Sequence, residues 1–274
     1  MIRFIKQLVR RYMHHQVGAQ AAALAFYLLF MIFPFLIFLS ALLGILELNV
    51  AAILTALDNV IPHAAVEVIG MYLEHVRSYS SPSLAAFGLV FSIWFPVRAT
   101  NSLLRSVRTA YHLGPPKGVV SQGIKALLYT VLLITTVAVT LTVLSVSDHI
   151  LAWAVETLSL PHFVARLWER LRFPIAGAAG FFALSALYIL AQDSWPKWRS
   201  IWPGTVFALL GWLGLSWGYN YYVEHFADYS ALYGSIGTVI VVLIWLNLTA
   251  VVLIMGAEVN GVLMNWGKED ETGR

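Results

Sequence analysis

Long apolar segments alternate with short polar ones along the 274 residues of this chain. A helix needs about 20 apolar residues to cross the hydrocarbon core of a bilayer. Five segments are long enough, and a sixth has only 14 uncharged residues before Arg98 interrupts it. The pattern predicts an all-α polytopic membrane protein, a single bundle of six transmembrane helices at about residues 21–46, 84–104, 124–147, 173–191, 202–223 and 236–259.

Two further kinds of helix are predicted outside these spans. In residues 2–14, apolar side chains such as Ile5 fall on one face of a helix and basic ones such as Arg10 on the other. A helix of this kind lies in the plane of a membrane surface that carries anionic lipids. The alternative is a basic flank that only sets the orientation of the first span. Short amphipathic helices are also expected in the first outer loop, residues 47–83.

Composition supports a membrane location and excludes several other classes. Hydrophobic residues make up 59% of the chain and charged residues 11%, whereas soluble domains carry about 25% charged residues. The same values exclude disordered and collagen-like chains. Since there is no cysteine, disulfides, thiolate metal sites and thiol nucleophiles are excluded too. We expect one membrane domain over residues 1–266, followed by a short polar tail at 267–274.

The positions of the basic residues predict how the chain is oriented. Cytoplasmic loops of membrane proteins carry an excess of Lys and Arg. With six spans, both termini fall on the basic, cytoplasmic side. If residues 84–97 did not cross the membrane, the later loops would invert and most of this bias would be lost. Of the 17 basic residues, the opposite loops contain only Arg77, Arg166, Arg170 and Arg172.

Several motifs resemble the YihY/BrkB-like family of bacterial inner-membrane proteins. They are the stretch from Ala21 to Pro34, Trp202-Pro203-Gly204, the stretch from Asp228 to Gly237, and Gly256-Ala257-Glu258-Val259-Asn260. The resemblance implies about six transmembrane helices in the bacterial inner membrane. Members of the family have been labelled ribonuclease BN and virulence factor, and a part in envelope lipid export has been suggested. The motif residues expected to be structural are Pro34, Tyr229, Tyr233, Gly234, Ser235, Gly237, Gly256 and Asn260.

A basic stripe follows the short span. Arg98, Asn101, Arg105 and Arg108 are spaced by three, four and three residues, which places them within about 80° of arc on a helix. Arg98 falls in the inner half of the membrane, where an ionisable residue points to function. One interpretation is a track of guanidinium groups that grip the phosphates of lipid headgroups. The other is a cytoplasmic anchor whose side chains reach back to the interface.

The last span contains a single acidic residue, Glu258, near its inner end. Asn247 precedes it by 11 residues and lies on the same face. Both side chains could line a polar pathway, with Glu258 paired to Arg98 or Arg105, or they could hold helices together. Gly234 and Gly237 at the start of this span permit either a broken helix beside a cavity or a tight turn.

No sequence motif indicates an enzyme. Nucleophile-elbow, phosphate-loop and dinucleotide-binding patterns do not occur in the sequence, and we expect no cofactor, bound metal or nucleic-acid partner. We expect an inner-membrane protein that assists the transport or organisation of lipids, including anionic ones. The alternatives are a membrane scaffold with partner proteins of the envelope and a transporter of small solutes.

Overall fold

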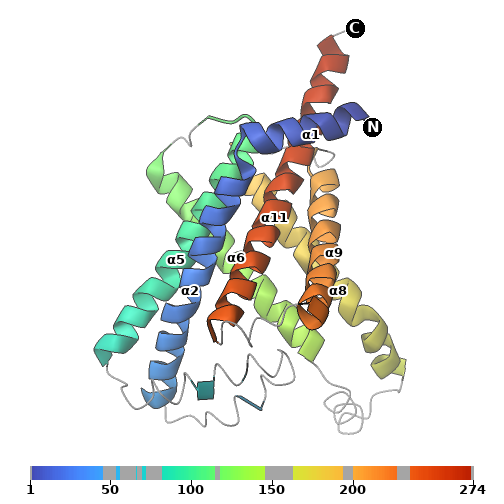
Figure 1. The fold of residues 1–274 in the computed structure, drawn as a ribbon. Helices are drawn as coiled ribbons and strands as arrows, with labels where there is room; N and C mark the ends of the chain where they lie inside the picture. Colours follow the sequence, from blue (N-terminus) through green and yellow to red (C-terminus); the bar gives the residue numbers. More distant parts are fainter. Residues whose placement is uncertain are drawn as a thin grey trace. The chain divides into compact units, whose positions relative to one another are not determined.

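The computed structural model describes residues 2–45, 54–55, 66, 70–71, 82–114, 118–145, 163–193, 200–226 and 235–272. Within these ranges the chain forms seven long helices and no strand, which confirms the all-α class (Figure 1). They are α1 (Ile2–His14), α2 (Val17–Ile45), α5 (Pro82–Ala110), α6 (Val119–Ser145), α8 (Phe163–Leu190), α9 (Trp202–Phe226) and α11 (Ser235–Thr272). Most of the predicted outer-loop helices fall outside the described residues.

Five of the described helices are long and apolar enough to cross a membrane. The spans are Val17–Phe38, Ser83–Ala110, Val120–Thr140, Arg170–Leu190 and Val239–Met264, on α2, α5, α6, α8 and α11. Helix α9 has 25 residues, including several glycines, tryptophans and tyrosines, and is not among these five spans. The sixth span therefore remains a prediction at this point.

Helix α5 extends further than the pattern predicts. The predicted span covers residues 84–104, whereas the helix continues to Ala110 and the apolar segment covers Ser83–Ala110. Pro96 lies inside it, as Pro34 lies inside α2. Proline is tolerated within transmembrane helices because neighbouring groups can satisfy the freed backbone carbonyls. Arg98 therefore lies within a continuous helix, two residues beyond a proline.

The surface of the spanning helices is apolar. On α6, the side chains of Ile124, Leu128, Val131 and Ile134 are each more than half exposed. A row of large exposed apolar side chains is costly in water and favourable in hydrocarbon. These side chains are therefore expected to face lipid.

The chain divides into two compact units. The first contains Met1–Phe30, Phe95–Thr130 and Phe181–Arg274, and the second contains Met31–Trp94 and Val131–Gly180. Helices α2, α5, α6 and α8 contribute to both units, whereas α1, α9 and α11 belong wholly to the first. Nearly all buried apolar side chains of the described residues lie in the first unit, which also contains the sites discussed below.

Helices α9 and α11 pack against each other in antiparallel orientation. The Gly204 amide donates a hydrogen bond to Oδ1 of Asn260 at 2.6 Å, and the Tyr219 hydroxyl donates to the Val241 carbonyl at 2.5 Å. The 15 residues between Gly204 and Tyr219 extend about 22 Å along a helix. A Cβ atom on Gly204 would overlap the backbone of Gly256, so glycine is required for this close approach. Helix α9 thus follows α11 through most of a membrane thickness.

Buried hydroxyl groups link further helices of the first unit. The hydroxyls of Thr100 on α5 and Thr130 on α6 lie 2.8 Å apart. The Tyr188 hydroxyl on α8 donates to the Leu253 carbonyl on α11 at 2.8 Å. Between membrane helices such bonds contribute about 0.6–2 kcal/mol each. They fix which helices are neighbours, because each buried hydroxyl needs its partner.

Candidate functional site

Helix α5 ends in a turn that leaves one carbonyl available. His112 has a left-handed backbone conformation, with φ of 53°. Its amide donates to the Thr109 carbonyl, and the Leu113 amide donates to the Arg108 carbonyl, which is the Schellman pattern of helix ends. The carbonyl of Ala110 instead accepts a hydrogen bond from Nη1 of Arg11 at 3.0 Å. A side chain of α1 therefore caps α5.

The same arginine forms an ion pair with the acidic residue of the last span. Nη1 of Arg11 lies 3.2 Å from Oε2 of Glu258, and Nδ1 of His15 lies 2.6 Å from Oε1. The Glu258 side chain is fully buried. We call Arg11, His15 and Glu258 the Glu258 clasp. An arginine of another helix does pair with Glu258, but that residue is Arg11 and not the predicted Arg98 or Arg105.

The clasp joins three elements of the first unit. Arg11 and His15 are four residues apart at the end of α1, so their side chains point the same way. Gln16 follows with φ of 52° and turns the chain into α2. The Gln20 side chain donates to the His15 carbonyl at 2.5 Å. Figure 1 shows α1 lying crosswise to α11, which it contacts.

His112 lies beside the clasp. Its ring centre is 5.4 Å from that of His15, with the rings in a T-shaped arrangement. Burial and, after it, the positive charge of Arg11 lower the pKa of His112, and the charge of Glu258 opposes this shift. His112 is therefore biased toward its neutral form in the folded protein.

Close contacts explain the family motif near the end of α11. A Cβ atom on Gly256 would overlap Ala208 and the Tyr188 hydroxyl, and one on Gly261 would overlap Arg11 and the Ala110 carbonyl. Asn260 is buried and donates from Nδ2 to the Tyr111 hydroxyl at 3.1 Å. The motif therefore brings α5, α9 and α11 together.

The other motif residues are less informative. Pro34 lies within α2, and Ser235 and Gly237 lie in the first turn of α11. Tyr229, Tyr233 and Gly234 lie outside the described residues, so the choice between a broken helix and a tight turn remains open. Asn247 is half-buried on α11.

Three of the four residues of the basic stripe line one groove. Its volume is about 430 Å³, and Arg98, Asn101 and Arg105 form its wall on α5. We call it the arginine groove. Helix α2 forms the opposite wall. Two of its lining residues are small alanines, which keep the groove wide, and two have polar groups. The remaining lining residues are Ser102, Ser106 and Thr109 of α5 and Ala19, Gln20, Ala23 and Tyr27 of α2.

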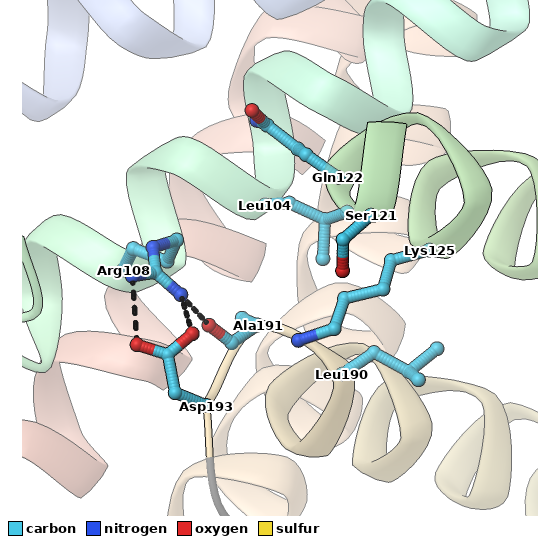
Figure 2. Close-up of a pocket in the computed structure, with 8 residues that line it drawn as sticks. All are labelled: Leu104, Arg108, Ser121, Gln122, Lys125, Leu190, Ala191 and Asp193. Carbon is cyan, nitrogen blue, oxygen red and sulfur yellow. Dashed lines mark hydrogen bonds and ion pairs between the residues drawn. The ribbon is translucent and has the colours of Figure 1, made fainter. Parts of the chain in front are cut away.

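Arg108 does not belong to this groove, and its predicted role with the other arginines is wrong. Around the helix it lies only about 20° from Asn101, but its side chain is buried. Its guanidinium forms a bidentate pair with Asp193, at 2.9 and 3.1 Å, and donates to the carbonyl of Ala191 (Figure 2). It also donates to the Gly114 carbonyl. Arg108 thus ties the end of α5 to the end of α8.

Lys125 has a similar structural role. It lines the small pocket in Figure 2 together with Arg108 and Asp193. Its Nζ donates to the Gln192 carbonyl at 3.0 Å, just beyond the end of α8. Cations stabilise the carbonyl-rich ends of helices. Arg11, Arg108 and Lys125 therefore all satisfy carbonyls at helix ends, in addition to any effect on topology.

The described residues contain no group of three or more His, Cys, Asp or Glu side chains that could hold a metal ion. The arrangement instead offers two polar features of different character. The Glu258 clasp is buried and its charges are paired within the protein. The arginine groove is open, and the side chains of Arg98 and Arg105 are exposed.

Comparison with known proteins identifies the family. Residues 8–274 match the model of the virulence factor BrkB family. The chain belongs to this family. It is 29% identical to the ribonuclease-like protein YfkH of Bacillus subtilis (strain 168), over 95% of this chain and 94% of YfkH. The family resemblance seen in the sequence is thus confirmed.

Other BrkB relatives carry only a general description. A UPF0761 membrane protein of Chromohalobacter salexigens is 27% identical over 94% of this chain and 62% of its own length. The UPF0761 membrane protein Smlt0865 of Stenotrophomonas maltophilia (strain K279a) is 24% identical over 94% and 60%. The chain therefore spans less than two thirds of these two relatives. No solved structure matches it significantly. Family and helices together identify an integral membrane protein.

Proposed function

We propose that this BrkB-family protein assists the transport or organisation of lipids in the bacterial inner membrane, and that the arginine groove holds their phosphate-bearing headgroups. The observation that carries the proposal is the placement of Arg98 and Arg105 in one open groove within a membrane-spanning segment. Arginine grips phosphate through two parallel hydrogen bonds. Hydroxyl and amide side chains of the same groove can bind the remaining headgroup oxygens.

The depth of the groove fits such a role. The span Ser83–Ala110 has 28 residues, or about 42 Å of helix, against a hydrocarbon core of about 30 Å. Arg105 lies about 8 Å and Arg98 about 18 Å from the helix end at Ala110. The two cations therefore lie at successive depths. A headgroup entering the groove would exchange water for polar partners, which lowers the cost of its desolvation.

The proposal includes six spans, with both termini in the cytoplasm. Antiparallel packing of α9 along α11 supports α9 as the sixth span. Hydrogen bonds also link the end of α5 to the end of α8 and to Asn260 of α11, and the start of α9 to the same Asn260. The six-span topology assigns all these ends to one side of the membrane. The basic residues at these ends favour the cytoplasmic side.

A scaffold role is the second candidate, and the Glu258 clasp favours it. In a polar pathway that includes Glu258, the transported molecule would have to reach the Glu258 carboxylate. However, this side chain is fully buried and both of its oxygens have partners. A paired, buried charge of this kind fixes the positions of helices. The clasp thus fits a structural element beside the groove, while the groove itself favours lipid handling.

The proposal is non-enzymatic. The sequence-predicted inner loops offer only Asp193 and the acids of the tail as candidates for acid–base catalysis. Asp193 is paired with Arg108. The ribonuclease-like name belongs to YfkH, and incubation of the purified BrkB-family chain with RNA tests whether that activity extends to it. Catalytic cleavage of RNA by the purified chain, with or without added metal ions, would contradict the proposal.

Complementation tests the lipid function. A strain that lacks this protein and its relatives is scored for an envelope-lipid defect, with variants at matched expression. The double variant Arg98→Lys, Arg105→Lys keeps both charges but loses the bidentate geometry, so it should fail to restore the strain. The matched control is Arg3→Lys, Arg10→Lys on the exposed face of α1, which should restore it. Full restoration by the groove variant would favour the scaffold.

A further inference from the structure

Two buried N–H groups of α8 have no hydrogen-bond acceptor among the residues that the structure describes. They are Nε of Arg172 and the indole Nε1 of Trp168. The two residues are four positions apart on one helix, so their side chains are neighbours on one face. We propose that they form a binding site for the phosphodiester of a membrane lipid, separate from the arginine groove. We call Trp168 and Arg172 the α8 donor pair.

The chemistry of the α8 donor pair calls for an oxyanion. A buried donor without an acceptor has lost its contact with water and gained nothing in return. The indole N–H can only donate, and the Arg172 guanidinium also carries a permanent positive charge. Water satisfies an indole but leaves this charge unbalanced. A phosphodiester supplies both acceptor oxygens and a negative charge, and arginine binds it with charge-assisted hydrogen bonds.

Phe173 orients the Arg172 guanidinium without using its hydrogen-bond donors. Cζ of Arg172 lies over the Phe173 ring, 5.1 Å from the ring centre. This cation–π contact uses the flat face of an aromatic ring. The N–H groups of a guanidinium lie in its own plane. Nε therefore remains available to an acceptor oxygen while Phe173 holds the group in place.

The position of the α8 donor pair along its helix fits a lipid headgroup. Arg172 is the third residue of the apolar span Arg170–Leu190, and Trp168 lies two residues before that span. Tryptophan favours the headgroup level of a membrane. Large apolar side chains beside the pair are exposed and available to the acyl chains of a bound lipid. They are Leu167, Leu171 and Phe173.

The six-span topology places this end of α8 at the outer leaflet, so the choice of leaflet rests on the proposed function. Basic residues are normally depleted on that side. Nevertheless, three of the four basic residues that the sequence predicts there lie within residues 166–172. An arginine at this position is accounted for if it binds an anion of the outer leaflet.

Two substitutions remove the donors and change little else. Trp168→Phe deletes the indole N–H and keeps an aromatic ring, and Arg172→Lys keeps the charge but loses Nε–H and the planar geometry. Together they form the donor-pair variant. The control variant combines Trp217→Phe, at an exposed tryptophan of α9, with Arg170→Lys, at an exposed arginine of α8.

The test is a lipid add-back measured by native mass spectrometry. All proteins carry Arg98→Lys and Arg105→Lys, so that the arginine groove is weakened throughout. Each lipid-free protein receives equal amounts of phosphatidylglycerol and of diacylglycerol with identical acyl chains, which lacks phosphate. With the α8 donor pair intact, we expect about a tenfold preference for phosphatidylglycerol. The control variant should keep this preference, and the donor-pair variant should lose it.

The outcomes separate this site from the arginine groove. An unchanged preference in a folded donor-pair variant would overturn the inference. So would the absence of any preference in the groove-weakened protein, if the protein with an intact groove shows one, and the proposed function would then stand. Displacement of phosphatidylglycerol by equimolar inorganic phosphate would also overturn it, by assigning the α8 donor pair to a soluble anion.

Discussion

Nδ1 of His15 lies 2.6 Å from Oε1 of Glu258, although 243 residues separate them in the chain. Together with Arg11, this contact fastens α1 to the last helix at a fully buried carboxylate. The N-terminal helix is therefore an integral part of the first unit and does more than flank the first span.

Removing only the Arg11 charge of the clasp should destabilise the protein more than removing the charges of both Arg11 and Glu258. Arg11→Met leaves the Glu258 carboxylate buried without its cation, which costs about 3–5 kcal/mol. The double variant Arg11→Met, Glu258→Gln removes both charges and should recover a large part of this loss. Thermal unfolding in detergent measures both. A double variant less stable than Arg11→Met alone would contradict the ion pair as described.

Helix packing at the family motif predicts a strong glycine requirement. Gly256→Ala should destabilise the protein by about 1–3 kcal/mol, because the added methyl group overlaps Ala208 and Tyr188. Gly214→Ala on α9 is the matched control, since a Cβ atom there meets nothing within 4 Å. Thermal unfolding of the two variants, measured without chemical denaturant, compares them directly. Equal melting temperatures would contradict the close approach of α9 and α11.

Acid should weaken the region around His112. Its pKa is lowered from the ordinary value of 6.5, so below pH 6.5 the unfolded chain binds a proton before the folded one does. Stability is then lost as the pH falls from 6.5 toward the lowered pKa. His112→Asn, which tolerates the left-handed backbone, should reduce the loss between pH 7.5 and 5.5, measured as a change in melting temperature. His14→Asn serves as control. An identical pH response in wild type and His112→Asn would contradict the assignment.

Orientation can be tested with single cysteines, since the chain has none. Asp58→Cys and Asp228→Cys should react with a membrane-impermeant maleimide added outside, whereas Lys117→Cys and Lys197→Cys should be protected until the membrane is opened. Labelling of Asp58→Cys and Lys117→Cys from the same side would contradict a membrane span on α5. Labelling of Lys197→Cys and Asp228→Cys from the same side would contradict a membrane span on α9.

Sequence pattern predicts the helices far better than their contacts. Hydropathy is a local property, so α2, α5, α6, α8 and α11 follow from it directly. It also identifies Glu258 as a residue that needs a partner, because an unpaired acid at that depth is costly. The identity of the partner depends on how α1 folds back across α11. That information is absent from local spacing, although the four-residue spacing of Arg11 and His15 marks a polar pair on one side of this segment.

Arg108 illustrates the same limit in the groove. Spacing places it near Arg98, Asn101 and Arg105 on a helical wheel, yet it turns toward Asp193 at the end of α8. The reason is the end of α5 itself, where the turn at His112 and the Gly114 carbonyl draw its guanidinium away from the groove. A helical wheel describes direction around one helix and contains no information on which neighbour each direction meets.

Retention of lipid by the groove variant is the most direct test of the central claim. Wild type, Arg98→Lys with Arg105→Lys, and the control Arg3→Lys with Arg10→Lys are purified in the same detergent and examined by native mass spectrometry. If the arginine groove grips phosphate, wild type and control should retain phospholipid, and the groove variant should retain about tenfold less. Equal retention by all three proteins would contradict a phosphate grip by Arg98 and Arg105.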